Sequence, residues 1–571
     1  MEPQNLSKLQ IRAEVLAAIQ RLSSFNEAPQ SEKQRCVARL KSLENNKYIS
    51  EVLSKELIRS DESRMKVVAY LIVELCSLED LKDDLWSYIK DTNISDYVKD
   101  MCAAVLRELG DNTDPAVFLS FLENPTEIID QETEKLLMNA LINPEAVVDF
   151  LDFLYSLPEN EQLNLINSLN QDYAGDHLAN ILVTTLESMP PENIQQVLIE
   201  ALGETKSEIS VPALYDLINY SKNPKIQKAA KKSLSMLKLS GVNTDESVKD
   251  SRGKDICSVT EAYECFSGYI DGAGSQGIIV SRIKPEKDIL IYSAVINDIE
   301  GVIDCFGFGS ISVADYERIV CRFARDALCV KVSPKFCKYV LNKAELINKK
   351  NNTPIPYEYI AWKNLIYDFP EYETSAEDEL TSSNGFQVVN NPGMLFDFPE
   401  LKYWFLDEND SPYVKPFVKR MVDKLIENRN SFKQDISELS DLLNKEIDSI
   451  IPTIFDTDCA DIYAERLINI ALLFDFQNLV DFRNVAVSLA SDINNNGISS
   501  ENRTFFEIIM RKTLIEGFLR YRHEESGNKA QGKFISRFPR KLENPVNKIP
   551  PEFLEDFDAI INALCAEWEI G

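Results

Sequence analysis

Apolar residues recur with a helical period from about residue 6 to residue 240, and glycine and proline fall between the periodic stretches. The clearest stripe follows Pro191 at spacings i, i+3, i+4, i+7 and i+8, and consists of Ile194, Val197, Leu198, Ala201 and Leu202. Gly203 then supplies a helix end, and Asn223-Pro224 supplies the N-cap and first-turn proline of a later helix. Because each helix is short and apolar on one side only, none would be stable alone. The pattern therefore predicts an array of packed helices.

The helical region contains a repeat of about the length of one helix pair. A similar helix-ending leucine returns at spacings of 34, 32, 28, 33 and 32, at Leu75, Leu109, Leu141, Leu169, Leu202 and Leu234. The stretches 103–111 (AAVLRELGD), 201–204 (ALGE) and 211–214 (VPAL) resemble HEAT-like repeats, of the kind also found in phycobilin lyases, over roughly residues 60–240. The pattern departs at Leu141 and Leu169, where the glycine turn is missing. The resemblance implies an α-solenoid that holds another macromolecule. Tetratricopeptide repeats are the competing assignment, and the Ala-Leu-Gly turn favours HEAT-like repeats.

The pattern changes after residue 240. Residues 241–255 are polar and lack an apolar period, which indicates a linker. Short β-branched segments separated by turn residues then predict an antiparallel meander of about four strands, at 269–270, 277–283, 289–296 and 302–306. Ser312 with Asp315, and Ser333-Pro334, open two helices. Residues 256–368 are therefore expected to form a small α+β domain.

The remaining residues predict a connection followed by helices. Residues 369–411 carry prolines, acids and aromatic side chains, and we expect the aromatic residues to pack on a neighbour: Phe396, Phe398, Tyr403, Trp404 and Phe405. The helical period returns over residues 412–571. The expected fold is mainly α, with an amino-terminal solenoid over residues 1–240, the small α+β domain and a carboxyl-terminal helical domain.

Charge changes the functional interpretation. The chain is 44% apolar and 27% charged, which fits an ordinary soluble protein, and its net charge of -31 would repel a nucleic acid. No lysine or arginine lies between Lys135 and Lys206, whereas acids recur throughout that stretch. The candidate partner-binding residues are Glu145, Asp149, Asp152, Glu159, Asp172 and Asp176. The first three share one helical face opposite the apolar stripe, so this surface either docks a basic segment of another protein or is a solvated face.

Two basic segments contrast with the acidic stretch. The last predicted helix of the array carries Lys222, Lys225, Lys228, Lys231 and Lys232. It is interpreted either as a polar capping repeat or as a contact with the later domains. Residues 511–541 carry nine basic residues against three acids. This second segment could touch RNA, bind the acidic array in cis or in trans, or be merely solvated.

The residues expected at catalytic sites are sparse. Eleven cysteines occur without a CxxC pair, and the two histidines, His177 and His523, have no adjacent nucleophile. The GxGxxG at Gly272, Gly274 and Gly277 is followed by an apolar strand and not by a helix, which indicates a hairpin turn and not a dinucleotide site. No cofactor and no metal is predicted. A divalent metal held by strand-end acids remains the alternative, and its candidates are Asp271, Asp298 and Asp304.

The sequence favours a non-catalytic protein that binds or scaffolds another protein through the solenoid. The alternative is an enzyme of unknown reaction, with a metal or ligand site in the α+β domain or a lyase-like action on a bound prosthetic group. The latter is implied only by the resemblance. No apolar stretch of 18 residues occurs and the first residues lack a secretion signal, so a cytoplasmic location without membrane contact is expected.

Overall fold

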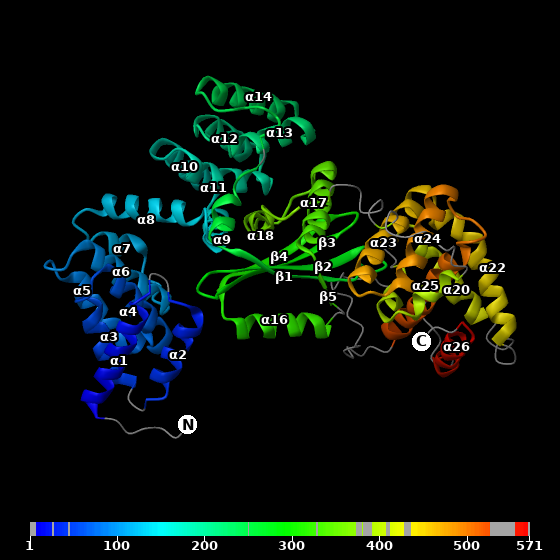
Figure 1. Cartoon of the computed structure of the whole chain (residues 1–571), viewed down its shortest axis with the longest axis horizontal. Coiled ribbons are helices and arrows are strands. Elements are labelled where there is room, and N and C mark those ends of the chain that lie inside the picture. The colour runs from blue at the N-terminus through cyan, green and yellow to red at the C-terminus, as the bar shows by residue number, and fades with distance from the viewer. Residues whose placement is uncertain are drawn as a thin grey trace.

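The computed structural model of the chain describes residues 7–25, 28–43, 46–248, 250–326, 329–372, 380, 391–406, 411–427, 436–525 and 554–568. Over these residues the protein is mainly helical and contains one small antiparallel sheet of five strands, which confirms the predicted fold class at this level. Figure 1 shows one helical group at one end, the sheet in the middle with a second helical group above it, and a further helical group at the other end.

The first helical group has its own apolar core, which extends from Ile11 to Phe118. Its helices are α1 (Lys8–Leu22), α2 (Gln30–Lys41), α3 (Asn46–Leu57), α4 (Glu62–Leu75), α5 (Leu78–Lys90), α6 (Asp96–Glu108) and α7 (Pro115–Leu119). A capping box at Ser7 and Gln10 begins α1, and the Asp61 carboxylate caps α4.

The second helical group has a separate core, which extends from Leu137 to Leu237 and includes Ala361 of a later helix. Its helices are α8 (Pro125–Asn139), α9 (Pro144–Ser156), α10 (Glu159–Asp172), α11 (Asp176–Glu187), α12 (Glu192–Glu204), α13 (Ser210–Tyr220) and α14 (Pro224–Leu239). The predicted cap is present, because the Asn223 side chain accepts from the Lys225 amide and Pro224 occupies the first turn of α14. The predicted array therefore contains two cores, which α8 connects (Figure 1).

The sheet has the order β4-β3-β2-β1-β5, and every neighbouring pair is antiparallel. Its strands are β1 (Glu261–Gly268), β2 (Ser275–Ile283), β3 (Ile289–Asn297), β4 (Gly301–Ile311) and β5 (Cys329–Val332). The helices of this region are α15 (Lys254–Ser258), α16 (Val313–Asp326), α17 (Pro334–Asn351), α18 (Tyr357–Trp362) and η1 (Lys363–Ile366). One face of the sheet packs on α17 and α18, and α16 covers part of the other face (Figure 1).

The predicted meander is confirmed, with two corrections. Residues 269–270 do not form its first strand; they lie in the turn after β1, where both side chains are buried. The sequence analysis also missed β5, a strand of four residues that pairs with β1. The predicted caps at Ser312 and Ser333 are present, since Ser312 accepts from the Asp315 amide and Ser333 from the Phe336 amide.

The carboxyl-terminal helices share one apolar core with the sheet. They are η2 (Pro392–Asp397), η3 (Pro399–Tyr403), α20 (Val414–Glu427), α22 (Ile436–Ile454), α23 (Thr457–Phe476), α24 (Val480–Asn496), α25 (Arg503–Glu525) and α26 (Leu554–Glu567). Phe396, Phe398 and Trp404 of the aromatic connection pack as predicted, and the side chain of Tyr403 lies outside the described residues. Phe398 contacts Tyr269 and Phe474, and the Trp404 indole donates to the Ile270 carbonyl at 2.9 Å. The aromatic connection therefore packs between the turn after β1 and the carboxyl-terminal helices.

The first helical group also contacts the sheet region directly. The carboxylate of Asp288, in the turn between β2 and β3, accepts from the Gln30 amide at the start of α2 at 2.8 Å. The same carboxylate accepts from the Ser310 hydroxyl of β4 at 2.7 Å. Because Pro29 offers no side-chain cap, Asp288 caps α2 from a distant part of the chain. The first helical group is therefore attached to the sheet as well as to α8.

Candidate functional site

The structure places two of the predicted partner-binding acids against the chain's own sheet region. Glu145 and Asp152 both lie on α9. The Gly309 amide of β4 donates to Glu145 at 2.7 Å, and the Tyr357 hydroxyl of α18 donates to Asp152. The Glu145 contact occupies a backbone amide at the edge of β4, which protects that edge from pairing with another strand. These two acids therefore fasten α9 to the sheet region.

Asp149 shares the α9 face and is exposed. Partial burial, with the neighbouring charges of Asp152 and Glu108, raises the pKa of Asp149. Among the described residues, Asp149 makes no ion pair, and the neighbouring charges that raise its pKa are negative. Of the remaining predicted residues, Asp176 accepts from the Ser207 hydroxyl, whereas Glu159 and Asp172 lie exposed on α10.

The exposed acids on α10 and α12 form a second surface, which we name the acidic ladder. It consists of Glu159, Glu161 and Asp172 of α10 and Glu192, Glu200 and Glu204 of α12. The two helices lie side by side, because Asn193 donates to Glu159 near their starts and Asn170 donates to Glu204 at 2.8 Å near their ends. Among the described residues, the one ion pair made by the ladder joins Glu192 to Lys225 at 3.9 Å. The ladder is therefore an exposed surface of almost uncompensated negative charge.

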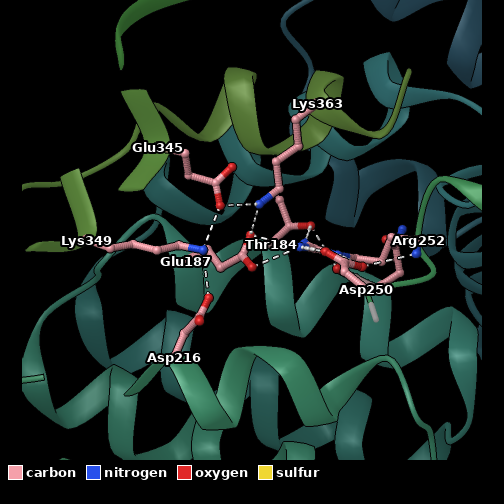
Figure 2. Close-up of polar contacts among 9 residues, drawn as sticks. Thr184, Glu187, Asp216, Asp250, Arg252, Glu345, Lys349 and Lys363 are labelled. Atoms are coloured by element: carbon pink, nitrogen blue, oxygen red, sulfur yellow. Dashed lines mark hydrogen bonds and ion pairs between the residues drawn. The ribbon is translucent and has the colours of Figure 1, made fainter. Parts of the chain in front are cut away.

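A buried network of charges lies where the second helical group meets the sheet region (Figure 2). Four carboxylates and three cations take part: Glu187 of α11, Asp216 of α13, Asp250 and Arg252 before α15, Glu345 and Lys349 of α17, and Lys363 of η1. Arg252 is central, with a side chain that is 0% exposed and donates to Glu187 at 2.8 Å. Lys363 lies 3.1 Å from both Glu187 and Glu345. The network therefore joins both parts of the molecule and the segment between them.

The paired cations set the pKa values in this network. Burial opposes ionisation of Asp250, but the charge of Arg252 outweighs it and lowers the pKa of Asp250 to about 2. Burial likewise opposes ionisation of Glu345, and Lys363 and Lys349 nevertheless hold its pKa well below the usual range. With every cation paired, the network suits a structural role better than proton transfer.

Acidification is expected to weaken the protein as the pH falls from about 4 towards about 2. Asp250 and Glu345 have lower pKa values in the folded chain than in the unfolded chain, so their charged forms stabilise the fold above about pH 4. That stabilisation is lost as each carboxylate is protonated. Urea midpoints measured over this pH range should show the loss, and Asp250→Asn, which removes one of these titrations, should show a shallower decline. Equal declines in both proteins would contradict the assignment of Asp250.

The three strand-end acids of the metal alternative do not converge. Asp298 accepts from Arg466 of α23 at 2.6 Å, and Asp271 accepts from the Ala273 and Ser275 amides. Asp304 lies on β4 and accepts from the amide of Cys305. Among the described residues, no group of three or more histidine, cysteine, aspartate or glutamate side chains could hold a metal ion. The described part of the chain therefore offers no support for metal-assisted catalysis.

A cavity of about 180 Å³ lies beside Asp298, between the sheet, α17 and α23. Its polar side chains are paired across it: Arg466 with Asp298, Lys343 with Glu465, and Gln276 with Asn469. Gly272 and Gly274 of the GxGxxG lie in the turn from β1 to β2, as predicted, whereas Gly277 lies in β2, and Gly274 has a φ of +87°. A Cβ there would lie 1.9 Å from the Asp298 carboxylate, so glycine is required by close packing. These pairs join α23 to α17 and to the sheet around the cavity.

No protein-family model, curated protein or solved structure matches this chain. Its function is therefore argued from its own residues. Among the described helices, none combines the length and the apolar character needed to cross a membrane. His523 lies at the end of α25, where the structure does not describe side chains, and most of the basic segment 511–541 lies outside the described residues.

The sequence analysis missed the three buried arginines that fasten the parts together, Arg252, Arg282 and Arg466. Arg282 of β2 donates to Asp368 at 2.6 Å and to the Leu365 carbonyl at 3.1 Å. In sequence these arginines lie in a polar linker, a strand and a helix with no shared motif. Apart from Asp250, which pairs with Arg252, their charged partners are distant along the chain, so the sequence does not distinguish them from exposed arginines.

Proposed function

We propose that this protein is a non-catalytic binding protein, in which a HEAT-like solenoid presents the acidic ladder to a basic segment of another protein. The observation that carries the proposal is the exposed negative charge of α10 and α12, which has almost no cationic partner among the described residues. Complementary charge speeds encounter and fixes register in protein complexes.

Repeated contacts in the second helical group support the solenoid. Glu159 with Asn193, Asn170 with Glu204, and Ile199 with Ser233 are each hydrogen-bonded and each 34 residues apart. The first two pairs join α10 to α12 and the third joins α12 to α14. Equal separation at successive helices is the geometry of a repeat that stacks on its neighbour.

The buried network supports a binding role in a second way. A surface that holds a partner loses less conformational entropy on binding when it is already fixed. The network fastens α11 and α13, which belong to the same core as α10 and α12, to the sheet region. The acidic ladder therefore lies on a helical group that the network attaches to the sheet region.

Fluorescence anisotropy with a labelled lysine-rich peptide tests the proposal. We expect the full chain to bind this peptide with an affinity that falls as the salt concentration rises. A peptide in which serine replaces every lysine should not bind. The variant Glu161→Lys, Asp172→Lys, Glu200→Lys should bind at least about tenfold more weakly. It leaves Glu145 and Asp152 intact, because these two hold α9 to the sheet region.

A matched variant separates the ladder from the overall charge. Glu79→Lys, Asp83→Lys, Asp441→Lys makes the same change in net charge at exposed positions of α5 and α22. It should keep most of the affinity. Equal losses in both variants would show attraction to the whole acidic molecule, and the ladder would then not be the binding surface.

A further inference from the structure

The helix α14 ends the second helical group and carries the opposite charge to its neighbours. It packs on α12 and α13 through its inner side, where Ile226, Ala230 and Leu237 are buried. Its outer side carries exposed lysines: Lys225, Lys228, Lys231, Lys232 and Lys238. Figure 1 shows α14 at the outer end of this group, away from the sheet. The helix therefore presents a basic surface at the end of an acidic stack.

These lysines have almost no partner within the chain. Among the described residues, α14 makes one ion pair, between Lys225 and Glu192 at 3.9 Å, and these side chains are 85% and 56% exposed. Such an exposed pair contributes little to stability. The described part of the later domains makes no ion pair with α14, so the predicted contact with those domains is not seen there.

The spacing of charge on α14 suits the acidic ladder. Lys225, Lys228 and Lys232 follow one another at about one helical turn. On α12 the acids Glu192, Glu200 and Glu204 are separated by one or two turns. Since α10, α12 and α14 lie in sequence side by side, the molecule presents an acidic part and a basic part of one continuous layer.

The overall charge decides which anionic partner suits α14. A net charge of -31 repels nucleic acids and anionic membranes as whole bodies, because their charge extends well beyond the contact. A second copy of this chain also has that net charge, but it offers a compact cluster of acids at the ladder and a basic face on α14. Where salt screens the repulsion between the two net charges, the lysines of one copy and the acids of the other can still attract each other at short range.

We infer that the lysine face of α14 docks on the acidic ladder of a second copy, so that the protein self-associates through α14 and α10–α12. The inference rests on the proposed function, because it takes the ladder to be a binding surface and names one partner for it. Two copies placed antiparallel can make this contact twice, which closes a dimer.

Sedimentation velocity of the full chain tests the inference. At moderate ionic strength, where salt screens the repulsion between the two net charges, the protein should associate as its concentration rises, and high salt should reverse the association. The variant Lys228→Glu, Lys231→Glu, Lys232→Glu should weaken self-association at least about tenfold. The control Lys55→Glu, Lys254→Glu, Lys445→Glu makes the same change in net charge at exposed positions and should still associate.

A mixture of reversed variants gives the sharpest result. The α14 variant keeps its ladder, and Glu161→Lys, Asp172→Lys, Glu200→Lys keeps its α14 lysines. Each alone should remain monomeric, and an equal mixture should form complexes that contain both. Far-ultraviolet circular dichroism should show the same helical content in both variants, so a loss of folding is not mistaken for a loss of contact.

Three results would overturn the inference. They are a wild-type chain that stays monomeric at every concentration and salt, association that the α14 variant does not weaken, and two variants that fail to associate when mixed. Two further probes are vesicles that contain phosphatidylserine and, separately, a labelled DNA duplex. If the chain does not self-associate but binds one of these probes, and this binding requires the α14 lysines, the helix is assigned to that partner instead. If the lysine-rich peptide still binds the ladder in these cases, the proposed function stands while the inference fails.

Discussion

Replacing Arg252 with alanine is expected to lower the free energy of unfolding by about 3–5 kcal/mol. The Arg252 side chain is 0% exposed and pairs with both Glu187 and Asp250. Its removal leaves the Glu187 and Asp250 carboxylates without their main cationic partner. Lys363 cannot fully replace it, because Lys363 already pairs with Glu187 and Glu345. Urea unfolding, followed by tryptophan fluorescence and circular dichroism, measures the loss.

The control for Arg252→Ala is Lys228→Ala, which removes an exposed cation from α14 of the second helical group. Its effect should stay within about 0.5 kcal/mol. A second comparison, Glu187→Gln with Arg252→Met, removes both charges of one pair and should cost less than the sum of the single changes. A loss below about 1 kcal/mol for Arg252→Ala would contradict a stabilising role for the network.

Replacing Arg466 with alanine is also expected to cost about 3–5 kcal/mol. The guanidinium is buried, contacts both oxygens of Asp298 at 2.6 and 2.9 Å, and donates to the Gly272 carbonyl. Because Arg466 lies on α23 and its partners lie in turns of the sheet, the change should loosen the carboxyl-terminal helices from the sheet. Hydrogen exchange should then accelerate at residues 269–274 and along α23.

Lys343→Ala is the matched control for Arg466→Ala. Lys343 lines the same cavity and pairs with Glu465, but these side chains are 39% and 63% exposed. The pair should therefore contribute less than about 1 kcal/mol. If Lys343→Ala and Arg466→Ala destabilise the protein equally, burial of the Arg466 pair is not what holds this junction.

Local signals in the sequence identified the elements whose structure is set by nearby residues. Each helix cap depends on residues within a few positions of it, as at Asn223, Ser312 and Ser333. The strands β2 to β4 likewise have their own apolar patterns and are separated by short turns. The strand β5 has only four residues, and its pairing with β1 joins distant parts of the chain. The strand β1 is exposed over its first three residues, so it lacks a clear alternation, and the apolar Tyr269 and Ile270 that follow it are buried in a turn.

The candidate site shows the same limit. Helical spacing correctly grouped Glu145, Asp149 and Asp152 on one face of α9. It could not show that β4 and α18 donate hydrogen bonds to two of these acids, because that depends on the packing of residues more than 160 positions away. The run of acids from residue 145 to residue 204 did indicate a negative surface, and in the structure exposed acids of this run lie on α10 and α12 as well as on α9.

Hydrogen–deuterium exchange of the full chain, with and without the lysine-rich peptide, tests most directly whether the acidic ladder is the binding surface. The account predicts slower exchange along α10 and α12 when the peptide is bound, and no change in the turn between β1 and β2. It also predicts that Glu161→Lys, Asp172→Lys, Glu200→Lys abolishes this protection. Protection confined to α9, to the cavity beside Asp298 or to the carboxyl-terminal helices would contradict the account and place binding elsewhere.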